Sequence, residues 1–342
     1  MKITTLSTAL AAVLSMAMVG QANAYTSAGG KIEIQNLTVD VFDAAGNEIT
    51  FLPGTITSFL FTTTNTATLN GTTIVDSDNC AGVPAANTCN AAPPRLDSDL
   101  QLLGGSGHTE NDFTLDGPNA AGQPYSYADS AILTAQLSGD ASTSAGVITE
   151  TEISGNGDGN ASAILQSTTG FSFDFTVGPD GPYSITVSFE ANGEAYSESD
   201  NPGAILAIAQ GDISANTSLN QLSGGTGNAE WNPDGELNGC SSLNGGVTCS
   251  GEVDPTGESL NVVTSISTDP ASVHHSEGEV FFDYSITFNN LTEGQWSFAL
   301  AAQTNTSVIK RVQVPEPGVL LLVASGLIGM GATTRRRRNK QA

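Results

Sequence analysis

Alternating apolar and polar residues recur along the centre of the chain and set the first limit on its fold. Between residues 171 and 177, phenylalanine or valine occupies every second position, with serine, aspartate or threonine in between. The alternation continues over 183–190 and returns over 282–289. Because side chains of a strand point alternately to its two faces, this pattern predicts strands with one apolar and one polar face. The Gly-Pro-Asp-Gly turn at 178–181 predicts that the first two strands form an antiparallel hairpin.

Two features near the N-terminal end of this region predict local geometry. Apolar residues alternate over 31–34 and again over 37–41, but the second run is shifted by one residue. Such a shift predicts a β-bulge near Gln35 and Asn36. The sequence Asp-Ala-Ala-Gly-Asn at 43–47 predicts a turn, because these residue types favour turn conformations.

Three segments depart from the alternating pattern. Residues 76–103 are expected to form a loop, and residues 125–139 are the one stretch with helical potential. Residues 204–209 fit either a buried strand or a short helix. Strands separated by polar turns account for most of the rest, so we expect an all-β fold. The interpretation is an antiparallel β-sandwich of the jelly-roll type that spans residues 25–313.

Four cysteines bear on this domain. Cys80 and Cys89 have eight residues between them, and so do Cys240 and Cys249. In an exported chain four cysteines indicate two disulfides, which leaves three pairings open. Local pairing, Cys80–Cys89 and Cys240–Cys249, is favoured because each enclosed segment contains turn-forming residues. A zinc site is the alternative, and the absence of CxxC pairs argues against it.

The first 24 residues have the three parts of a secretory signal peptide. Lys2 is their only charge, residues 6–19 are apolar, and Ala22 and Ala24 form an Ala-x-Ala cleavage site. A first transmembrane helix is disfavoured by the short apolar run and its small-residue end. The pattern predicts export through the Sec machinery and a mature chain that begins at Tyr25.

The C-terminal segment 314–342 has a pattern of its own. A stiff, extended tetrapeptide opens it: Val314, Pro315, Glu316 and Pro317. The apolar run that follows has about 17 residues, close to the lower limit for a helix that crosses a bilayer. Four positive charges close it: Arg335, Arg336, Arg337 and Arg338. Since such a block stays on the cytoplasmic side, we expect a single transmembrane helix with the domain outside.

This order of features resembles the PEP-CTERM sorting signal of Gram-negative bacteria. In that family a membrane protease-transpeptidase, the exosortase, recognises the tail and cuts near the Pro-Glu-Pro. The resemblance implies an exosortase-like partner, transient anchoring in the inner membrane, and delivery to the cell surface or extracellular matrix. Ala128-Asp129-Ser130-Ala131 is similar to a segment found in some PEP-CTERM proteins. An ordinary anchor that is never cut is the alternative.

Charge and motif content argue against several functions. The formal net charge is −25, and four positive residues lie between the terminal segments: Lys31, Arg95, Lys310 and Arg311. So acidic a surface repels nucleic acid. The sequence has no GxSxG, HExxH, P-loop or dinucleotide-binding motif. The adjacent His274 and His275 are expected in a solvated loop, and in a strand they would point to opposite faces. We therefore expect a protein that is not an enzyme.

Clustered oxygen ligands offer a candidate calcium site. Asn156, Asp158 and Asn160 supply the hard donors that calcium prefers, and residues 76–79 form a second cluster of this kind. Neither cluster has the spacing of an EF-hand loop, and clusters of this kind are more often plain turns. Calcium therefore remains a candidate ligand, and no other cofactor is expected.

The two tryptophans offer a second route to binding. Trp231 lies in a Gly- and Asn-rich segment and is expected to be exposed, where it would stack on sugar rings. Trp296 is in phase with Phe298 and Leu300 and is expected in the core. Together with the sorting signal, these features predict a surface or matrix protein associated with exopolysaccharide and with biofilm or floc formation. The alternatives are a carbohydrate- or calcium-binding module and a secreted polysaccharide hydrolase, for which no pattern selects a carboxylate pair.

Overall fold

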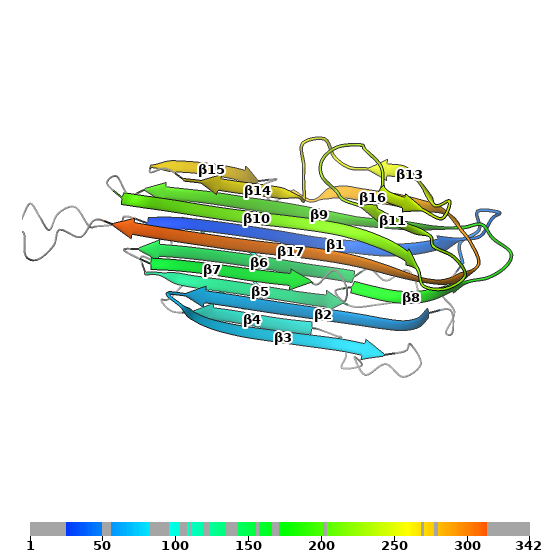
Figure 1. Cartoon of the computed structure of the whole chain (residues 1–342), viewed down its shortest axis with the longest axis horizontal. Coiled ribbons are helices and arrows are strands. Elements are labelled where there is room, and N and C mark those ends of the chain that lie inside the picture. The colour runs from blue at the N-terminus through cyan, green and yellow to red at the C-terminus, as the bar shows by residue number, and fades with distance from the viewer. Residues whose placement is uncertain are drawn as a thin grey trace, which may run out of the picture.

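Two antiparallel β-sheets make up the described part of the chain in a computed structural model (Figure 1). The structure describes residues 25–49, 56–82, 96–102, 108–109, 111–118, 123–134, 143–154, 157–165, 171–200, 204–267, 270–276 and 280–312. None of these residues is helical, and no helix long and apolar enough to cross a membrane occurs among them. The transmembrane helix predicted within 314–342 lies outside the described residues. The predicted all-β, antiparallel class is confirmed, and the jelly-roll type stays a prediction.

The first sheet has eight strands. They are β1 (Tyr25–Phe42), β4 (Leu96–Leu102), β5 (Tyr125–Thr134), β6 (Thr143–Ser154), β9 (Tyr183–Asp200), β13 (Thr248–Val253), β15 (Ala271–Ser276) and β16 (Phe282–Leu291). Their order is β13-β16-β9-β1-β6-β5-β4, and β15 also pairs with β9. The longest strands, β1 and β9, therefore form the middle of this sheet.

The second sheet has nine strands. They are β2 (Ile56–Leu69), β3 (Thr72–Gly82), β7 (Gly157–Leu165), β8 (Phe171–Val177), β10 (Ala204–Gln221), β11 (Asn228–Trp231), β12 (Ser241–Asn244), β14 (Val262–Ile266) and β17 (Gly294–Val312). Their order is β12-β11-β10-β17-β7-β2-β3; β14 pairs with β10, and β8 pairs with β17 and β2.

Large aromatic side chains fill one half of the space between the two sheets. The rings of Phe189 on β9 and Trp231 on β11 lie 6.1 Å apart, so the contact joins one sheet to the other. Within the second sheet, the rings of Phe173 and Phe298 are 5.4 Å apart. Trp296 is also fully buried, as predicted. Because burying one such side chain contributes roughly 2–3 kcal/mol, this half holds the main apolar core.

Small residues and hydroxyl groups line the other half. The Oγ1 atoms of Thr151 on β6 and Thr306 on β17 are 2.8 Å apart across the interface. Ser130 on β5 donates a hydrogen bond to Asn65 Oδ1 on β2 at 2.9 Å. A Cβ atom on Gly211 would lie 2.5 Å from the carbonyl oxygen of Gly29, so the two backbones meet with no side chain between them. Hydrogen bonds and close backbone contact thus act here beside a smaller apolar cluster that includes Leu69, Ile153 and Val308.

The predicted bulge and turn in and after β1 are both confirmed. The register of β1 against β9 shifts between Gln35 and Thr38, and Asn36 has a φ of 54°. After the strand, Asp43 Oδ1 accepts hydrogen bonds from the amides of Ala45 and Asn47, both at 2.8 Å. Aspartate organises its own turn in this way.

The structure corrects two predictions of local structure and decides a third, which left strand and helix open. Residues 125–134 form strand β5 instead of a helix. β5 pairs with β4 on one side and with β6 on the other, and this pairing outweighs a weak local preference for helix. The predicted loop at 76–103 contains the end of β3 and all of β4. Residues 204–209 are strand, as part of β10.

The predicted hairpin of 171–177 with 183–190 is wrong. β8 pairs with β17 and β2, whereas β9 pairs with β1, β15 and β16, so the two segments belong to different sheets. The turn at 178–182 therefore carries the chain from one sheet to the other. Alternation correctly shows which side chains face inward, but it carries no information about which strand lies alongside.

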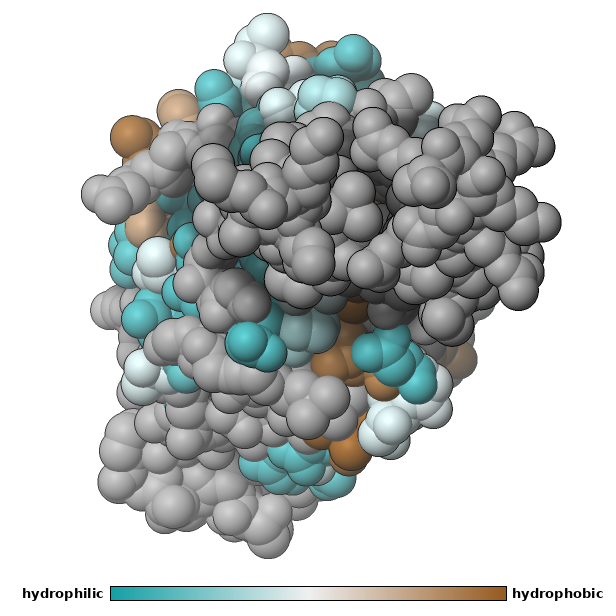
Figure 2. All heavy atoms as spheres, turned by 90° about the vertical axis from the view of Figure 1, so that its left-hand side faces the viewer, coloured by the Kyte–Doolittle hydropathy of each residue, from teal (hydrophilic) through white to brown (hydrophobic). Residues whose placement is uncertain are grey.

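The described chain begins and ends at the same end of the body. Tyr25 pairs with Asp200 and Val312 pairs with Ala204, which follows Asp200 closely in sequence (Figure 1). β17 has 19 residues and is therefore roughly 60 Å long. Figure 2 looks onto this end and shows hydrophilic residues, with hydrophobic ones between them in a few places. The aromatic core lies toward the opposite end, where β17 starts.

A disulfide joins the two sheets at that opposite end. Cys240 directly precedes β12 of the second sheet, and Cys249 lies in β13 of the first. Their Cα atoms are 6.0 Å apart, which confirms the predicted pair. Cys80 lies in β3 and Cys89 is outside the described residues, so the Cys80–Cys89 pairing stays a prediction.

Removing this disulfide is expected to destabilise the fold. For the Cys240→Ser/Cys249→Ser double variant, the free energy of unfolding should fall by about 2–3 kcal/mol, the value for a loop of this length. Urea denaturation without reductant measures it. An unchanged urea midpoint would show that the two sheets are held together at this end without the disulfide.

Asp254, next to β13, should make stability depend on pH. Its carboxylate is buried and accepts hydrogen bonds from the amides of Asp234 at 2.9 Å and Gly235 at 3.1 Å. Burial raises the pKa of Asp254 from 3.8 to about 6. Between these values the native state binds the proton more strongly than the unfolded state, so this contribution to stability is lost as pH rises.

The test compares the wild-type protein with the Asp254→Asn variant between pH 4 and 6. The free energy of unfolding of the wild type, relative to the variant, should fall as the pH rises through this window. Parallel stability curves for the two proteins would contradict the assigned pKa.

Candidate functional site

The sorting residues predicted from sequence lie outside the described part of the chain. They are Ala22, Ala24, Val314, Pro315, Glu316, Pro317, Arg335, Arg336, Arg337 and Arg338. Tyr25, the predicted first residue of the mature chain, is the first residue of β1. Cleavage at that position would therefore leave the described domain intact.

The candidate calcium residues do not form a turn where the structure describes them. Asp158 and Asn160 lie in β7, where their backbones pair with Ile309 and Ser307 of β17. Asn156 lies outside the described residues. The second cluster, 76–79, lies in strand β3. The turn interpretation is therefore wrong for these residues, and calcium binding stays a prediction.

Trp231 is buried, so the prediction of an exposed aromatic residue is wrong. Its indole Nε1 donates a hydrogen bond to Glu252 Oε1 at 2.8 Å, and none of its surface is exposed. The Gly- and Asn-rich segment around it forms the short strand β11, which pairs with β10. Trp231 is therefore not available to stack on sugar rings.

His274 and His275 lie in strand β15 instead of a loop. His274 Nε2 is 3.1 Å from Glu198 Oε2, and its ring stacks on Tyr196. His275 Nε2 is 3.1 Å from the carbonyl oxygen of Ser259. The two rings have different partners, as expected for neighbours in a strand.

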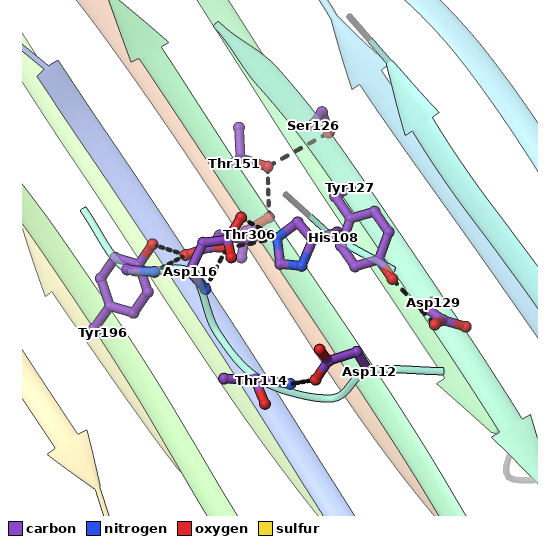
Figure 3. Close-up of polar contacts among 12 residues, drawn as sticks. His108, Asp112, Thr114, Asp116, Ser126, Tyr127, Asp129, Thr151, Tyr196 and Thr306 are labelled. Carbon is purple, nitrogen blue, oxygen red and sulfur yellow. Dashed lines mark hydrogen bonds and ion pairs between the residues drawn. The ribbon is translucent and has the colours of Figure 1, made fainter. Parts of the chain in front are cut away.

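A cluster that the sequence analysis missed lies on the outer face of the first sheet (Figure 3). His108 Nε2 lies 2.8 Å from Glu150 Oε2 and 3.6 Å from Asp116 Oδ2. The three donor atoms all lie within 4.8 Å of one another. Among the described residues this is the one group of three metal-ligating side chains that meets this distance. We call it the His108 cluster.

Residues 108–109 and 111–118, the covering segment, bring His108 and Asp116 to Glu150 of β6. Phe113 of this segment packs into a small apolar cluster with Tyr127 and Ile148. A Cβ atom on Gly146 would lie 2.7 Å from the Phe113 ring, so this position of β6 accepts the ring because it has no side chain. The first sheet is thus covered on its outer face as well as its inner face.

Glu150 is completely buried, and three hydrogen-bond donors and the ring of His108 surround its carboxyl group. Oε1 accepts hydrogen bonds from the amide of Gly117, at 2.9 Å, and from the hydroxyl of Tyr196. Oε2 accepts from the amide of Asp116 at 3.2 Å and faces His108 Nε2. A buried carboxyl group without hydrogen-bond partners would be strongly unfavourable, so these contacts are what make the burial of Glu150 possible.

The rings around the cluster fix its orientation. His108 stacks on Tyr127 with ring centroids 4.0 Å apart and an angle of 3° between the planes (Figure 3). Burial, and then the charge of Glu150, raise the pKa of Tyr125 and of Tyr196. Both phenols therefore stay protonated, and Tyr196 keeps the hydrogen that it donates to Glu150.

Asp129 forms a second attachment for the covering segment. Its Oδ2 accepts hydrogen bonds from the Tyr127 hydroxyl at 3.0 Å and from the amide of Asn111 at 2.7 Å. Asp129 and Ser130 belong to the Ala-Asp-Ser-Ala segment of β5. Asp129 binds the covering segment on the outer face of the first sheet, and Ser130 hydrogen-bonds to the second sheet on the inner face.

The sequence contains only a faint signal for this cluster. Glu150 and Glu152 share one face of β6 with Gly146 and Ile148, so an acidic pair buried on that face requires donors from elsewhere. His108 is 42 positions away from Glu150 and lies in a segment without regular structure. Spacing alone could not bring the two together.

Comparison with known families bears on the C-terminal segment. Residues 313–338 match the model of the PEP-CTERM protein-sorting motif. The chain carries a PEP-CTERM motif. This motif supports an exported protein that is transiently anchored at the membrane, with an exosortase as its processing partner. No curated protein and no solved structure matches the chain, so the PEP-CTERM motif is what connects it to known proteins.

Removing the His108 side chain should destabilise the domain much more than removing an exposed histidine. His108→Ala leaves Glu150 buried with one polar partner fewer and is expected to lower the free energy of unfolding by about 2–4 kcal/mol. His274→Ala is the matched control, because His274 also pairs with a glutamate but has 47% of its side chain exposed. It should cost less than about 1 kcal/mol.

Urea denaturation of the two variants at pH 7 provides the comparison. Equal losses of stability in both would contradict a structural role for the buried pair.

Proposed function

We propose that this protein is a non-enzymatic component of the cell surface or extracellular matrix, released by an exosortase and associated with exopolysaccharide. The observation that carries the proposal is the PEP-CTERM motif, which begins directly after the last strand of an acidic, all-β domain. Only Gln313 and Val314 separate Val312, the last residue of β17, from Pro315. A cut near Pro315–Pro317 would release the domain without removing any of its strands.

The placement of the chain ends is compatible with this processing. Since the described chain begins and ends at one end of the body, a membrane-inserted tail would hold that end toward the membrane. The opposite end, with the Cys240–Cys249 disulfide, would then stand roughly 60 Å away along β17. Such a domain would already face outward before it is cut.

The outer face of the second sheet supports an interaction with neutral polysaccharide. Along β2, partly exposed threonines alternate with buried residues: Thr62, Thr64, Thr66 and Thr68. Between residues 210 and 220 of β10, most outward side chains are uncharged: Gln210, Ser214, Asn216, Ser218 and Asn220. Asp212 is the charged exception. Hydroxyl and amide groups in rows hydrogen-bond well to sugar hydroxyls. The net charge of −25 would disfavour an anionic polymer unless cations bridge the two.

The contacts of the described histidines and of Trp231 support a role without catalysis. The described histidines and Trp231 contact other parts of the domain: His108 faces Glu150, His274 faces Glu198, and Trp231 donates to Glu252. These contacts position strands and the covering segment, so the same groups serve the fold. A carbohydrate-binding module that uses Trp231 is correspondingly less favoured, as is a polysaccharide hydrolase.

Sorting is tested by the intact mass of the protein in culture supernatant and in membranes. The expected extracellular species begins at Tyr25 and ends near Pro315–Pro317. A variant with alanine at positions 315–317 should remain in the membrane fraction, whereas His274→Ala should be released like the wild type. A wild-type protein that keeps Arg335–Arg338 and stays in the inner membrane would contradict the proposal.

The matrix role has a separate test. Deleting the gene should reduce cell aggregation and the amount of exopolysaccharide retained by the cells. The wild-type gene should restore both, and the variant with alanine at positions 315–317 should not. Unchanged aggregation and polysaccharide after deletion would leave export in place but refute the matrix role.

A further inference from the structure

We propose that His108, Asp116 and Glu150 form a binding site for a divalent transition-metal ion, with zinc as the best-fitting ion. The cluster offers one imidazole nitrogen and two carboxylate oxygens, a donor set that suits zinc and related ions. Two carboxylates and one neutral imidazole also balance the charge of a divalent cation. This site is independent of the sorting motif and of any polysaccharide contact.

The distances between the donor atoms are close to those that such an ion requires. In a tetrahedral site with metal–ligand bonds of about 2.0–2.1 Å, the donor atoms are roughly 3.3 Å apart. His108 Nε2 is 2.8 Å from Glu150 Oε2 and 3.6 Å from Asp116 Oδ2, on either side of that value. The oxygens of Asp116 and Glu150 lie within 4.8 Å of each other, so adjustment of side chains, above all of the partly exposed Asp116, would place all three donors around one ion.

The surroundings hold the donors in place, as outer contacts do in metal sites. Gly117 and Tyr196 both hydrogen-bond to Oε1 of Glu150, which fixes the carboxylate and turns Oε2 toward His108. Stacking on Tyr127 fixes the plane of the His108 ring. The geometry thus exists before an ion arrives, so binding would require little rearrangement.

The local charge also favours a cation. The carboxyl groups of Glu150, Glu152 and Asp116 all lie close enough to the buried Tyr125 to act on its hydroxyl group. Lys31, the positive residue on β1, lies within 3.7 Å of Glu33 and Glu194 and is engaged there. An ion in the cluster would offset negative charge that the sheet otherwise concentrates in one place.

One side of the cluster is open to solvent. The side chains of His108 and Glu150 are 1% and 0% exposed, whereas that of Asp116 is 27% exposed. An ion would therefore enter beside Asp116 and keep water in its remaining position, as incompletely ligated zinc sites do. Bound there, it would link the covering segment to β6 and stabilise the folded state by mass action.

Zinc sulfate titrated into the purified full-length chain at pH 7, followed by calorimetry and thermal unfolding, tests the site. We expect one ion per chain and a rise in Tm that grows with zinc concentration. Asp116→Asn is the decisive variant, because Asp116 is partly exposed and its loss leaves the buried pair intact. It should weaken zinc binding at least about tenfold, and His108→Ala should abolish it.

His274→Ala is the matched control. It removes an exposed histidine that faces a single glutamate, and zinc binding should be unchanged. Equal affinity in Asp116→Asn and the wild type would place any bound zinc elsewhere and overturn the proposal. Absence of binding to the wild type, with the fold intact by circular dichroism, would also overturn it. Neither result would affect export or release.

Discussion

The buried carboxylate of Glu150 is the constraint on which the first sheet depends. β6 faces the second sheet on one side and the covering segment on the other, so the carboxylate cannot reach water. The amides of Asp116 and Gly117, the hydroxyl of Tyr196 and the ring of His108 face its oxygens from two separate parts of the chain, the covering segment and β9. The covering segment has little regular structure of its own, so these contacts, together with Phe113 and the hydrogen bond from Asn111 to Asp129, are what place it.

The space between the two sheets is packed differently at the two ends of the same strands. Near the end where β17 starts, aromatic rings separate the sheets and supply most of the apolar burial. Near the end where the chain enters and leaves, Gly211 and the hydroxyls of Thr151 and Thr306 bring the backbones close together. Hydrogen bonds are directional, whereas apolar contacts are not, so the narrow half fixes how the sheets align.

Much of the fold was accessible from sequence because it rests on local rules. The bulge at Asn36, the turn at Asp43, burial of Trp296 and the Cys240–Cys249 pair each follow from a few neighbouring residues. The wrong hairpin prediction concerns which strands pair with each other, whereas the prediction of which side chains face inward there is correct. Alternation correctly gave the inward side of β8 and β9 but placed them side by side, although they belong to different sheets. Trp231 was misjudged because its polar neighbours concealed a short strand.

The His108 cluster could not be predicted for a related reason. Nothing in the spacing of His108, Asp116 and Glu150 indicates that a loop folds back over a strand. The glycine at 146 and the acidic residues at 150 and 152 are compatible with such a cover, but they identify neither the segment nor its histidine. Long-range placement of this kind depends on the whole sheet being assembled.

Hydrogen–deuterium exchange of the Asp116 and Gly117 amides is the most direct measurement of this account. If Glu150 holds the covering segment against β6, both amides should exchange slowly in the wild type and much faster in Glu150→Gln. The amide of Ala45, which is bonded to Asp43 in an exposed turn, gives the fast reference in both proteins. Exchange of Asp116 and Gly117 at the rate of Ala45 in the wild type would contradict the account, because the segment would then not be bound to the sheet.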